Sequence, residues 1–348
     1  MAGVRGGGMS NNREVAKLAG VSVATVSRAL QKPELVSLKT RNKVLSAIKK
    51  LDYRPNLMAA KFRSGKTGNL VVLVPTVANL FFARVISGMQ EAAHQKGYSI
   101  LLCNTFGDPE MEEGYAKMVH TCQADGVIQL RAYNPFPAQD TGGSSTALPM
   151  VNACEVLDNT TVPTVTLDNR AAARAMTEHL LQLGHRRIAV VMGPKNSPLT
   201  RDRLAGYRDA LQEAGIAFDE SLLCPGDFTL HSGRKAAGEL IERKDSPTAI
   251  FCENDEMAMG AIQRLKQSGL RVPEDISVAG FDDIAFAQFS DPPLTTIAQP
   301  AEEFGSTAVS LLIDLLEGRI KKAPKVTLPF ELVVRSSTGP TSNKETVQ

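Results

Sequence analysis

The sequence contains few cysteines, and their spacing excludes the common structural uses of this residue. The five lie at positions 103, 122, 154, 224 and 252, an odd number with no CxxC spacing. Each is in or near an apolar run, which favours small buried side chains over a disulfide framework or a zinc site. We therefore expect a cytoplasmic protein without a bound metal or cofactor.

Long hydrophobic runs and catalytic motifs are also missing. The longest apolar runs, such as residues 70–74, are far shorter than the roughly 20 residues that cross a bilayer. Residues 1–10 are glycine-rich without the apolar stretch of a secretory signal, and we expect a disordered extension there. No GxSxG or HExxH motif occurs, and no histidine pairs with a serine or cysteine motif. The sequence predicts neither a membrane protein nor an enzyme.

The small total charge hides a strong asymmetry along the chain. Residues 1–66 contain 14 lysines and arginines against three acids, whereas the remainder contains 25 basic and 34 acidic residues. A basic segment joined to an acidic body is typical of a chain that binds a polyanion through one end. The alternative, a solvated lysine-rich surface, depends on which motifs the basic segment contains.

The basic segment has the pattern of three short helices. The first carries an apolar stripe at Val15, Leu18 and Ala19. A second helix is expected after Ser22 and a basic third helix after Ser37, because serine is a preferred N-cap. Two short helices joined by a tight turn match the helix-turn-helix motif, whose second helix enters the major groove of DNA.

The outer face of the second helix carries the candidate DNA contacts. Val23 and Ala24 lie at its start and suit apolar contacts with base edges, while Arg28 suits a guanine or a phosphate. The residues with hydroxyl groups that suit phosphate oxygens are Ser22, Thr25 and Ser27. A generic three-helix packing module is the alternative, but it would not need this cationic face.

These residues resemble a known family. The segment AGVSVATVSRAL at residues 19–30 is similar to the lac repressor family of bacterial regulators, and the resemblance extends from about residue 11 to residue 335. It implies a transcriptional repressor that binds a double-stranded DNA operator as a homodimer. It also implies that a small-molecule effector controls the affinity for DNA.

Residues 56–67 are expected to form a hinge. Pro55 disfavours helix at Arg54, and Asn56 can cap a following helix of about seven residues, which is too short to be stable alone. The resemblance implies that two such helices of a dimer fold in the minor groove and insert an apolar side chain between base pairs. The matching position here is Phe62, where the family usually has leucine, so we assign Asn56 and Phe62 to DNA contacts.

The rest of the chain alternates short apolar strands with amphipathic helices. Strands are expected at residues 70–74, 99–102, 126–130, 150–154, 162–167, 188–192, 249–252 and 276–281. Helices are expected at residues 83–96, 111–123, 171–183, 203–214, 232–242 and 256–267. This alternation predicts parallel sheets covered on both faces, and its restart predicts two lobes. The expected fold is therefore an all-α helix-turn-helix domain followed by a two-lobed α/β core of doubly wound parallel sheets, as in periplasmic binding proteins of type I.

The expected organisation follows from these patterns. The extension covers residues 1–10, the helix-turn-helix domain 11–55, the hinge 56–67, the core 68–335 and a polar tail 336–348. Lobe one is expected to take about 68–167 and 300–327, and lobe two about 168–297 and 328–335. The tail has no leucine heptads, so a dimer is expected rather than a coiled-coil tetramer.

Ligands of doubly wound sheets bind beyond the carboxyl ends of the strands. The candidate effector-binding side chains near these ends are Asn79, Phe81, Phe82, Glu155, Arg203, Phe228, Asn254 and Asp282. Their carboxylates, amides, guanidinium and aromatic rings suit a neutral polyhydroxyl or ribosyl ligand. The resemblance implies the same role for Arg203, Asn254 and Asp282, although each polar residue could instead cap a helix, and Phe81 and Phe82 could pack in the core.

The sequence predicts the location of the effector site more narrowly than the identity of the effector. The pair Phe81–Phe82, the segment GDF at 226–228 and DPPLTTIAQP at 291–300 resemble a cytidine-responsive member of the family, which implies a nucleoside. Asn254 followed by Asp255 resembles sugar-responsive members, so a sugar or a purine stays open. A carrier of the periplasmic binding type is the alternative from another class, and the basic segment and the missing secretory signal disfavour it.

Overall fold

The computed structural model describes residues 12–31, 33–53, 66–136, 149–157, 161–320 and 323–341. The chain divides into two compact units, residues 1–67 and 68–348. The positions of these units relative to one another are not defined, and each is described by itself.

The first unit is built from three α-helices. They are α1 (Asn12–Ala19), α2 (Val23–Gln31) and α3 (Leu38–Lys50), with a 3-10 turn at Pro33–Leu35. Ser22 and Ser37 accept hydrogen bonds from the backbone N–H groups of Thr25 and Thr40, which begins α2 and α3 at the positions expected from the sequence. Tyr53 closes the unit by donating a 2.7 Å hydrogen bond to the side chain of Asn12.

A small apolar core holds these helices together. Val15, Val26 and Val44, one from each helix, are fully buried. The expected stripe on α1 is partly wrong, because Leu18 is 50% exposed and Ala16 is buried in its place. The reason is geometric: α1 packs against both α2 and α3, so two adjacent positions of this short helix face inward.

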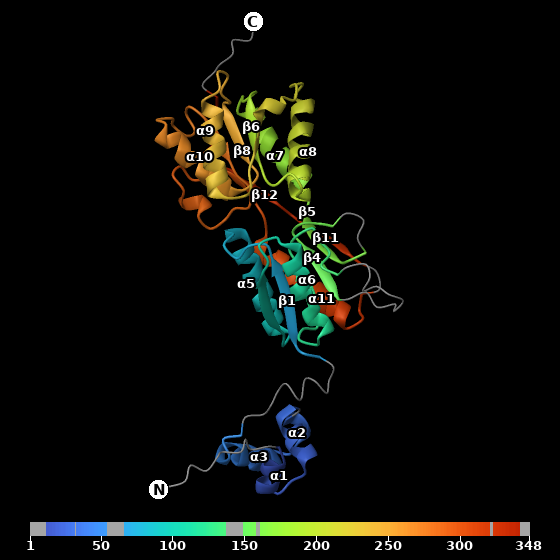
Figure 1. Ribbon diagram of the computed structural model, residues 1–348. Helices are drawn as coiled ribbons and strands as arrows, with labels where there is room; N and C mark the ends of the chain where they lie inside the picture. Colours follow the sequence, from blue (N-terminus) through green and yellow to red (C-terminus); the bar gives the residue numbers. More distant parts are fainter. Residues whose placement is uncertain are drawn as a thin grey trace, which may run out of the picture. The chain divides into compact units, whose positions relative to one another are not determined.

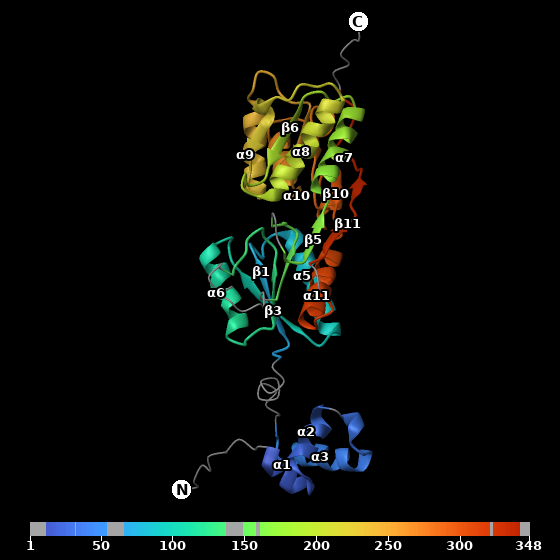
Figure 2. The same ribbon diagram turned by 90° about the vertical axis from the view of Figure 1, so that its right-hand side faces the viewer.

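Lobe one of the second unit is a six-stranded parallel sheet. Its strand order is β11-β5-β4-β3-β1-β2, and its strands are β1 (Asn69–Val74), β2 (Ser99–Asn104), β3 (Gly126–Gln129), β4 (Met150–Ala153), β5 (Thr164–Leu167) and β11 (Lys325–Leu328). The helices α5 (Leu80–Gln95) and α11 (Ala301–Leu316) cover one face, and α6 (Pro109–His120) covers the other (Figure 2).

Lobe two repeats this arrangement with a smaller sheet. Its order is β7-β6-β8-β9, from the strands β6 (Ile188–Met192), β7 (Leu223–Pro225), β8 (Ala249–Cys252) and β9 (Ser277–Ala279). Helices α7 (Asn169–Gln182) and α8 (Pro198–Glu213) lie on one side, and α9 (Leu230–Ile241) and α10 (Asp255–Gln267) on the other (Figure 1). The short antiparallel pair β10 (Thr296–Ala298) and β12 (Glu331–Val333) forms a separate sheet.

The two-lobed α/β fold predicted from the sequence is confirmed, with differences in detail. The helix α11 and the strands β7 and β10–β12 were not predicted from the sequence pattern. Helix α8 begins at Pro198, five residues before the expected start, so Arg203 lies in the second turn of the helix rather than at its first residue. Ser197 caps this helix, and Pro198 suits its first turn because that position needs no donor.

The chain after Arg335 is not simply a polar tail, as the sequence suggested. Ser337 is fully buried in lobe two; it donates to the carbonyl oxygen of Val278 (2.6 Å) and accepts from the N–H of Thr295 (2.8 Å). His185 contacts the carbonyl oxygen of Gly339 at 3.0 Å. Polar side chains are tolerated here because each meets a backbone partner, and the folded core therefore continues beyond residue 335.

Candidate functional site

The candidate DNA-binding face lies on α2. Val23, Ala24 and Arg28 are exposed on one side of this helix, and Ser27 is half-buried beside them. The opposite side packs into the core through the fully buried Val26. The outer side chains are therefore held on a short helix whose orientation is fixed by its own core.

The N-terminus of α2 is shaped by two hydroxyl groups. Ser22 Oγ accepts from the N–H of Thr25 at 3.1 Å and lies 2.9 Å from the Thr25 hydroxyl. This capping leaves the remaining N–H groups of the first turn as a site that favours phosphate oxygens. The other two predicted DNA contacts, Asn56 and Phe62, lie outside the described residues.

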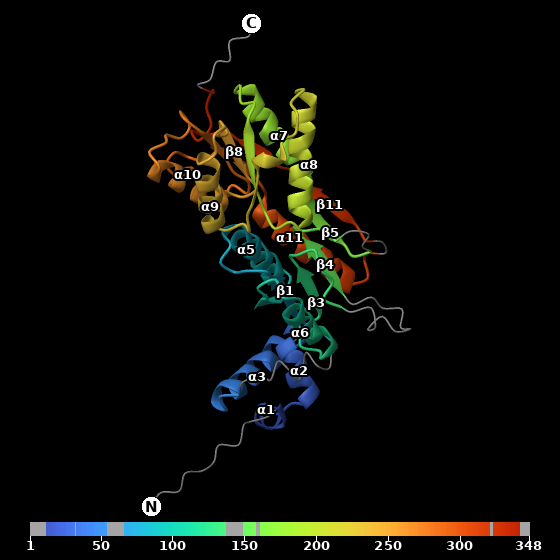
Figure 3. The ribbon, with the colours of Figure 1, turned by 45° about the horizontal axis from the view of Figure 1, so that its top comes forward.

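A cavity of about 560 Å³ lies between the two lobes. All eight side chains predicted for effector binding line it, namely Asn79, Phe81, Phe82, Glu155, Arg203, Phe228, Asn254 and Asp282. They come together because the parallel strands of each lobe end at the edge that faces the other lobe. Figure 3 shows this edge, where α5 of lobe one approaches α9 and α10 of lobe two.

Arg203 is the buried cation of the lobe-two side. Its guanidinium carbon lies 3.6 Å from the centre of the Phe281 ring, and its Nε donates to Asn169 at 2.9 Å. It also donates to the carbonyl oxygen of Glu253. Burial lowers the pKa of Arg203, and the nearby Asp282 is the largest opposing influence. The side chain thus has one fixed position at the cavity surface.

Three buried carboxyl groups surround this arginine. Burial raises the pKa of Asp282 to about 7, although Arg203 and a 2.7 Å hydrogen bond from Gln299 oppose the rise. Burial also raises the pKa of Glu253, to about 8, and raises that of Asp255 well above its usual range. Protonation near neutral pH therefore limits the negative charge around the cavity.

Two of the side chains predicted to bind the effector also cap helices. Asn79 caps α5 by accepting from the N–H of Phe82 at 3.0 Å. Asn254 caps α10 by accepting from the N–H of Met257 at 2.9 Å and donates to the carbonyl oxygen of Phe228. Both amides line the cavity, but these bonds show that they also position the surrounding backbone.

Hydrogen bonds join the two lobes beside the cavity, and Arg84 on α5 also donates to the carbonyl oxygen of Asp283 in lobe two at 3.0 Å. Glu256 on α10 accepts from the N–H of Leu80 at 3.2 Å and from the amide of Asn79 at 3.3 Å. Ser197 at the start of α8 donates to Glu155 at 2.8 Å. Burial raises the pKa of Glu256. These bonds cross from one lobe to the other, so they depend on how far the lobes are closed.

Several lining residues were missed by the sequence analysis. They are Phe106, Arg131, Ser197, Glu256 and Gln299. Arg131 follows β3 by two residues, so the strand-end rule could have found it. Glu256 is adjacent to the predicted Asn254–Asp255 pair in the first turn of α10. Phe106 follows β2 by two residues, so the same strand-end rule applies to it.

Strained backbone is concentrated at this cavity. Phe106, Cys154, Phe228 and Asp282 all have positive φ, from +54° to +117°, and all line it. Bulky or branched side chains rarely adopt this conformation, and proteins retain such strain mainly where the surroundings enforce it. This concentration supports the cavity as the candidate functional site.

None of the helices in the described ranges has both the length and the apolar character needed to cross a membrane.

Comparison with known proteins agrees with this geometry. Residues 13–56 match the model of the bacterial regulatory proteins of the lacI family, and residues 177–338 match the periplasmic binding protein-like domain. The chain is 39% identical over 326 residues to the HTH-type transcriptional repressor CytR of Escherichia coli strain K12, covering 94% of this chain and 95% of that protein. It is 35% identical to the HTH-type transcriptional repressor PurR of Photobacterium profundum, covering 94% of this chain and 98% of the relative.

A solved structure extends the likeness to three dimensions. The lac repressor dimer bound to operator and the anti-inducer ONPF matches with a TM-score of 0.85 and 31% identity, covering 95% of this chain and 99% of that one. Sequence and fold agree along nearly the whole length. The chain belongs to the lacI family of bacterial regulatory proteins.

Proposed function

We propose that the protein is a cytoplasmic transcriptional repressor that binds operator DNA as a homodimer and responds to a neutral nucleoside. The observation that carries the proposal is the interlobe cavity, where aromatic rings such as Phe82 and Phe228 line the same space as Arg203 and Asp282. Rings suit a planar base, while buried polar groups suit a ribose. The exposed face of α2 supplies the DNA contacts.

The charge of the cavity favours an uncharged ligand. Its lining has four carboxyl groups, Glu155, Asp227, Glu256 and Asp282, against the two cations Arg131 and Arg203. Burial raises the pKa of Asp282 to about 7, so partial protonation of this carboxyl group reduces the excess of negative charge near neutral pH. A phosphate group would add uncompensated negative charge to this enclosed space. We therefore expect a nucleoside rather than a nucleotide.

Lobe closure links the two sites in this proposal. A ligand that touches both lobes favours the arrangement in which it makes both sets of contacts. The interlobe bonds of Glu256 and Glu155 form in the arrangement observed here. A change in lobe arrangement in each subunit of a dimer alters how the two DNA-binding units are presented to the operator, which gives a coupling free energy between ligand and DNA.

Isothermal titration calorimetry with the full-length chain tests the ligand class. Nucleosides, nucleoside monophosphates, purine bases, pentoses and cellobiose are compared at one pH and one salt concentration. We expect nucleosides to bind at least about tenfold tighter than the matching monophosphates, because the cavity has no spare positive charge. Tight binding of a sugar or a free purine instead would reassign the effector, and preferred binding of monophosphates would contradict the charge argument.

Arg28→Ala tests the role of α2. If Arg28 contacts a guanine, the variant should lose about 1–3 kcal/mol of discrimination at one base pair of each half-site. Competition binding with a set of single-base operator variants measures this. Lys39→Ala, an exposed cation on α3, is the matched control and should leave base preference unchanged. Equal weakening by Arg28→Ala on every sequence would assign Arg28 to phosphate instead.

A further inference from the structure

Glu112 is a carboxylate buried in lobe one beneath the cavity surface. It lies in the first turn of α6 and has no exposed area. Its Oε1 accepts from Arg131 Nε at 3.0 Å and Thr105 Oγ1 at 3.2 Å, and its Oε2 accepts from Arg131 Nη2 at 3.1 Å and Gln129 Nε2 at 3.1 Å. A buried carboxylate is tolerated only with such complete pairing. Its partners are therefore held in fixed positions.

Arg131 extends this network to the cavity. It follows β3, lines the cavity and is 23% exposed. Two of its nitrogens are bonded to Glu112, while Nη1 has no hydrogen-bond partner among the residues that the structure describes. The bidentate bond fixes the plane of the guanidinium. One oriented donor is thus left for a ligand.

Phe106 is connected to the same carboxylate through the backbone. Thr105 and Asp108 close a tight turn in which Asp108 N–H donates to the Thr105 carbonyl oxygen at 2.9 Å. Phe106 and Gly107 at its centre have φ of +54° and +70°, as in a type I′ turn. The hydroxyl of Thr105 bonds to Glu112, and Asp108 caps α6, which carries Glu112. The Phe106 ring is 73% exposed at the cavity.

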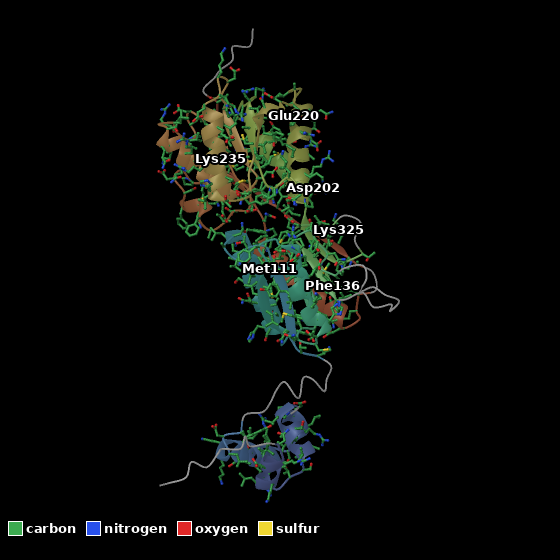
Figure 4. All side chains as sticks on the ribbon, in the orientation of Figure 1. Met111, Phe136, Asp202, Glu220, Lys235 and Lys325 are labelled. Carbon is green, nitrogen blue, oxygen red and sulfur yellow. The ribbon has the colours of Figure 1, made fainter. Side chains whose placement is uncertain are left out.

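The turn and the ion pair lie at one edge of lobe one. Strands β1, β2 and β3 are parallel, so the residues that follow β2 and β3 emerge at the same edge. Met111, the residue before Glu112 on α6, lies in the part of lobe one that is nearer to lobe two (Figure 4). An exposed aromatic ring and an oriented donor are therefore presented from one side of the cavity.

We propose that Phe106 and Arg131 recognise a planar ligand ring that carries a carbonyl oxygen, and that Glu112 positions both residues. The ring of the ligand stacks on Phe106, and Nη1 of Arg131 donates to the carbonyl oxygen. Because the charge of Arg131 is already balanced by Glu112, this donor suits a neutral acceptor better than a phosphate. The inference rests on the proposed function, and in a nucleoside the base supplies both ring and carbonyl.

The test compares nucleosides with and without a base carbonyl. Calorimetry on the full-length protein uses cytidine and inosine, which have one, and adenosine, which has none. We expect the wild-type protein to bind at least one of the carbonyl nucleosides about tenfold or more tightly than adenosine. A charge-assisted hydrogen bond supplies discrimination of that order.

The variant for this test removes both charges together. Arg131→Met alone would leave Glu112 buried without a partner, so it is combined with Glu112→Gln. The double variant should lose the discrimination between carbonyl nucleosides and adenosine, whereas a merely structural defect would weaken all three ligands alike. Arg319→Met with Asp314→Asn removes an ion pair of the same lobe outside the cavity lining and should keep the discrimination.

A second variant tests whether the ligand ring stacks on Phe106. Phe106→Asn keeps a residue that tolerates positive φ and should weaken all three nucleosides by about tenfold, because stacking does not depend on the carbonyl. Unchanged nucleoside affinity in Phe106→Asn, or unchanged discrimination in the double variant, would overturn the proposal while leaving the nucleoside function intact. A wild-type protein that binds no nucleoside would overturn both.

Discussion

At the scale of single residues, Phe106 combines an exposed ring with a backbone conformation that suits glycine or asparagine. Its φ is +54° and its exposed fraction is 73%. Phe106→Asn should therefore raise the free energy of unfolding by about 0.5–1 kcal/mol, since it relieves strain and removes little packing. Urea unfolding measures this. Phe289→Asn is the control, because Phe289 is 77% exposed without positive φ, and no gain is expected there.

Asp282 gives the molecule a defined pH dependence. An aspartate in an unfolded chain has a pKa of about 3.9, whereas burial raises that of folded Asp282 to about 7. The folded state therefore binds this proton more tightly, and its contribution to stability is full below about pH 4 and is lost as the pH rises toward about 7. Glu253, with a pKa of about 8, adds a change of the same sign.

Asp282→Asn removes one of the carboxyl groups that bind a proton more tightly in the folded state than in the unfolded state. The fall in unfolding free energy between about pH 5 and about pH 8 should be smaller in this variant than in the wild-type protein. Chemical unfolding at several pH values measures both slopes. Glu303→Gln, an exposed carboxylate on α11, should leave the slope unchanged. Identical slopes in Asp282→Asn and wild type would show that Asp282 is ionised throughout this range.

The sequence was informative about cavity residues wherever a simple rule of topology applied. All eight predicted residues line one space because polar groups that follow parallel strands converge at one edge. The rule also applies to Phe106, but the turn with two positive φ values that presents its ring had no signal in the sequence. The sequence also did not show that Asn79 and Asn254 cap helices, because asparagine suits both a helix cap and a ligand contact.

At the scale of elements, helix pairs approach closely through glycine. An added Cβ at Gly88 on α5 would lie 2.1 Å from the carbonyl oxygen of Glu302 near the start of α11. Backbone at such a crossing cannot move aside, so Gly88→Ala should lower the free energy of unfolding by about 1–3 kcal/mol or more. Thermal or urea unfolding checks this.

Gly114 on α6 is a matched control for that substitution. It also lies inside a helix, but an added Cβ would have no atom within 4 Å. Gly114→Ala should therefore stabilise the protein by about 0.5–1 kcal/mol, because alanine has the higher helix propensity. Similar effects of the two substitutions would mean that helix packing at Gly88 is loose.

Local sequence patterns predicted some ends of helices and strands correctly and others not. Strand β6 was predicted with its observed ends because a continuous apolar run defines it. The start of α8 was predicted too late, since the Ser197–Pro198 cap precedes the amphipathic part of the helix. The segment after Arg335 appeared polar and external, yet Ser337 is buried because backbone partners in lobe two satisfy its hydroxyl. Such partners are distant in sequence and give no local signal.

At the scale of the whole molecule, the core consists of two lobes that the chain joins at three crossings. Each lobe has its own parallel sheet, and the chain passes between them at β5 to α7, at β10 to α11 and at β11 to β12. The side-chain hydrogen bonds that join the lobes include those of Glu256, Glu155 and Arg84. A ligand in this space competes with or reinforces these few bonds. A modest binding free energy can therefore shift the balance between lobe arrangements.

The coupling of cavity and DNA-binding unit is the central claim, and DNA affinity at increasing nucleoside concentration tests it most directly. A duplex selected from a random pool by the full-length protein is compared with a scrambled duplex at one moderate salt concentration. The selected duplex should bind at least about 1,000-fold tighter, and the nucleoside should change that affinity by about 5- to 150-fold while leaving the scrambled duplex nearly unaffected. Equal affinity for both duplexes, or a selected-site affinity that no nucleoside changes, would contradict it.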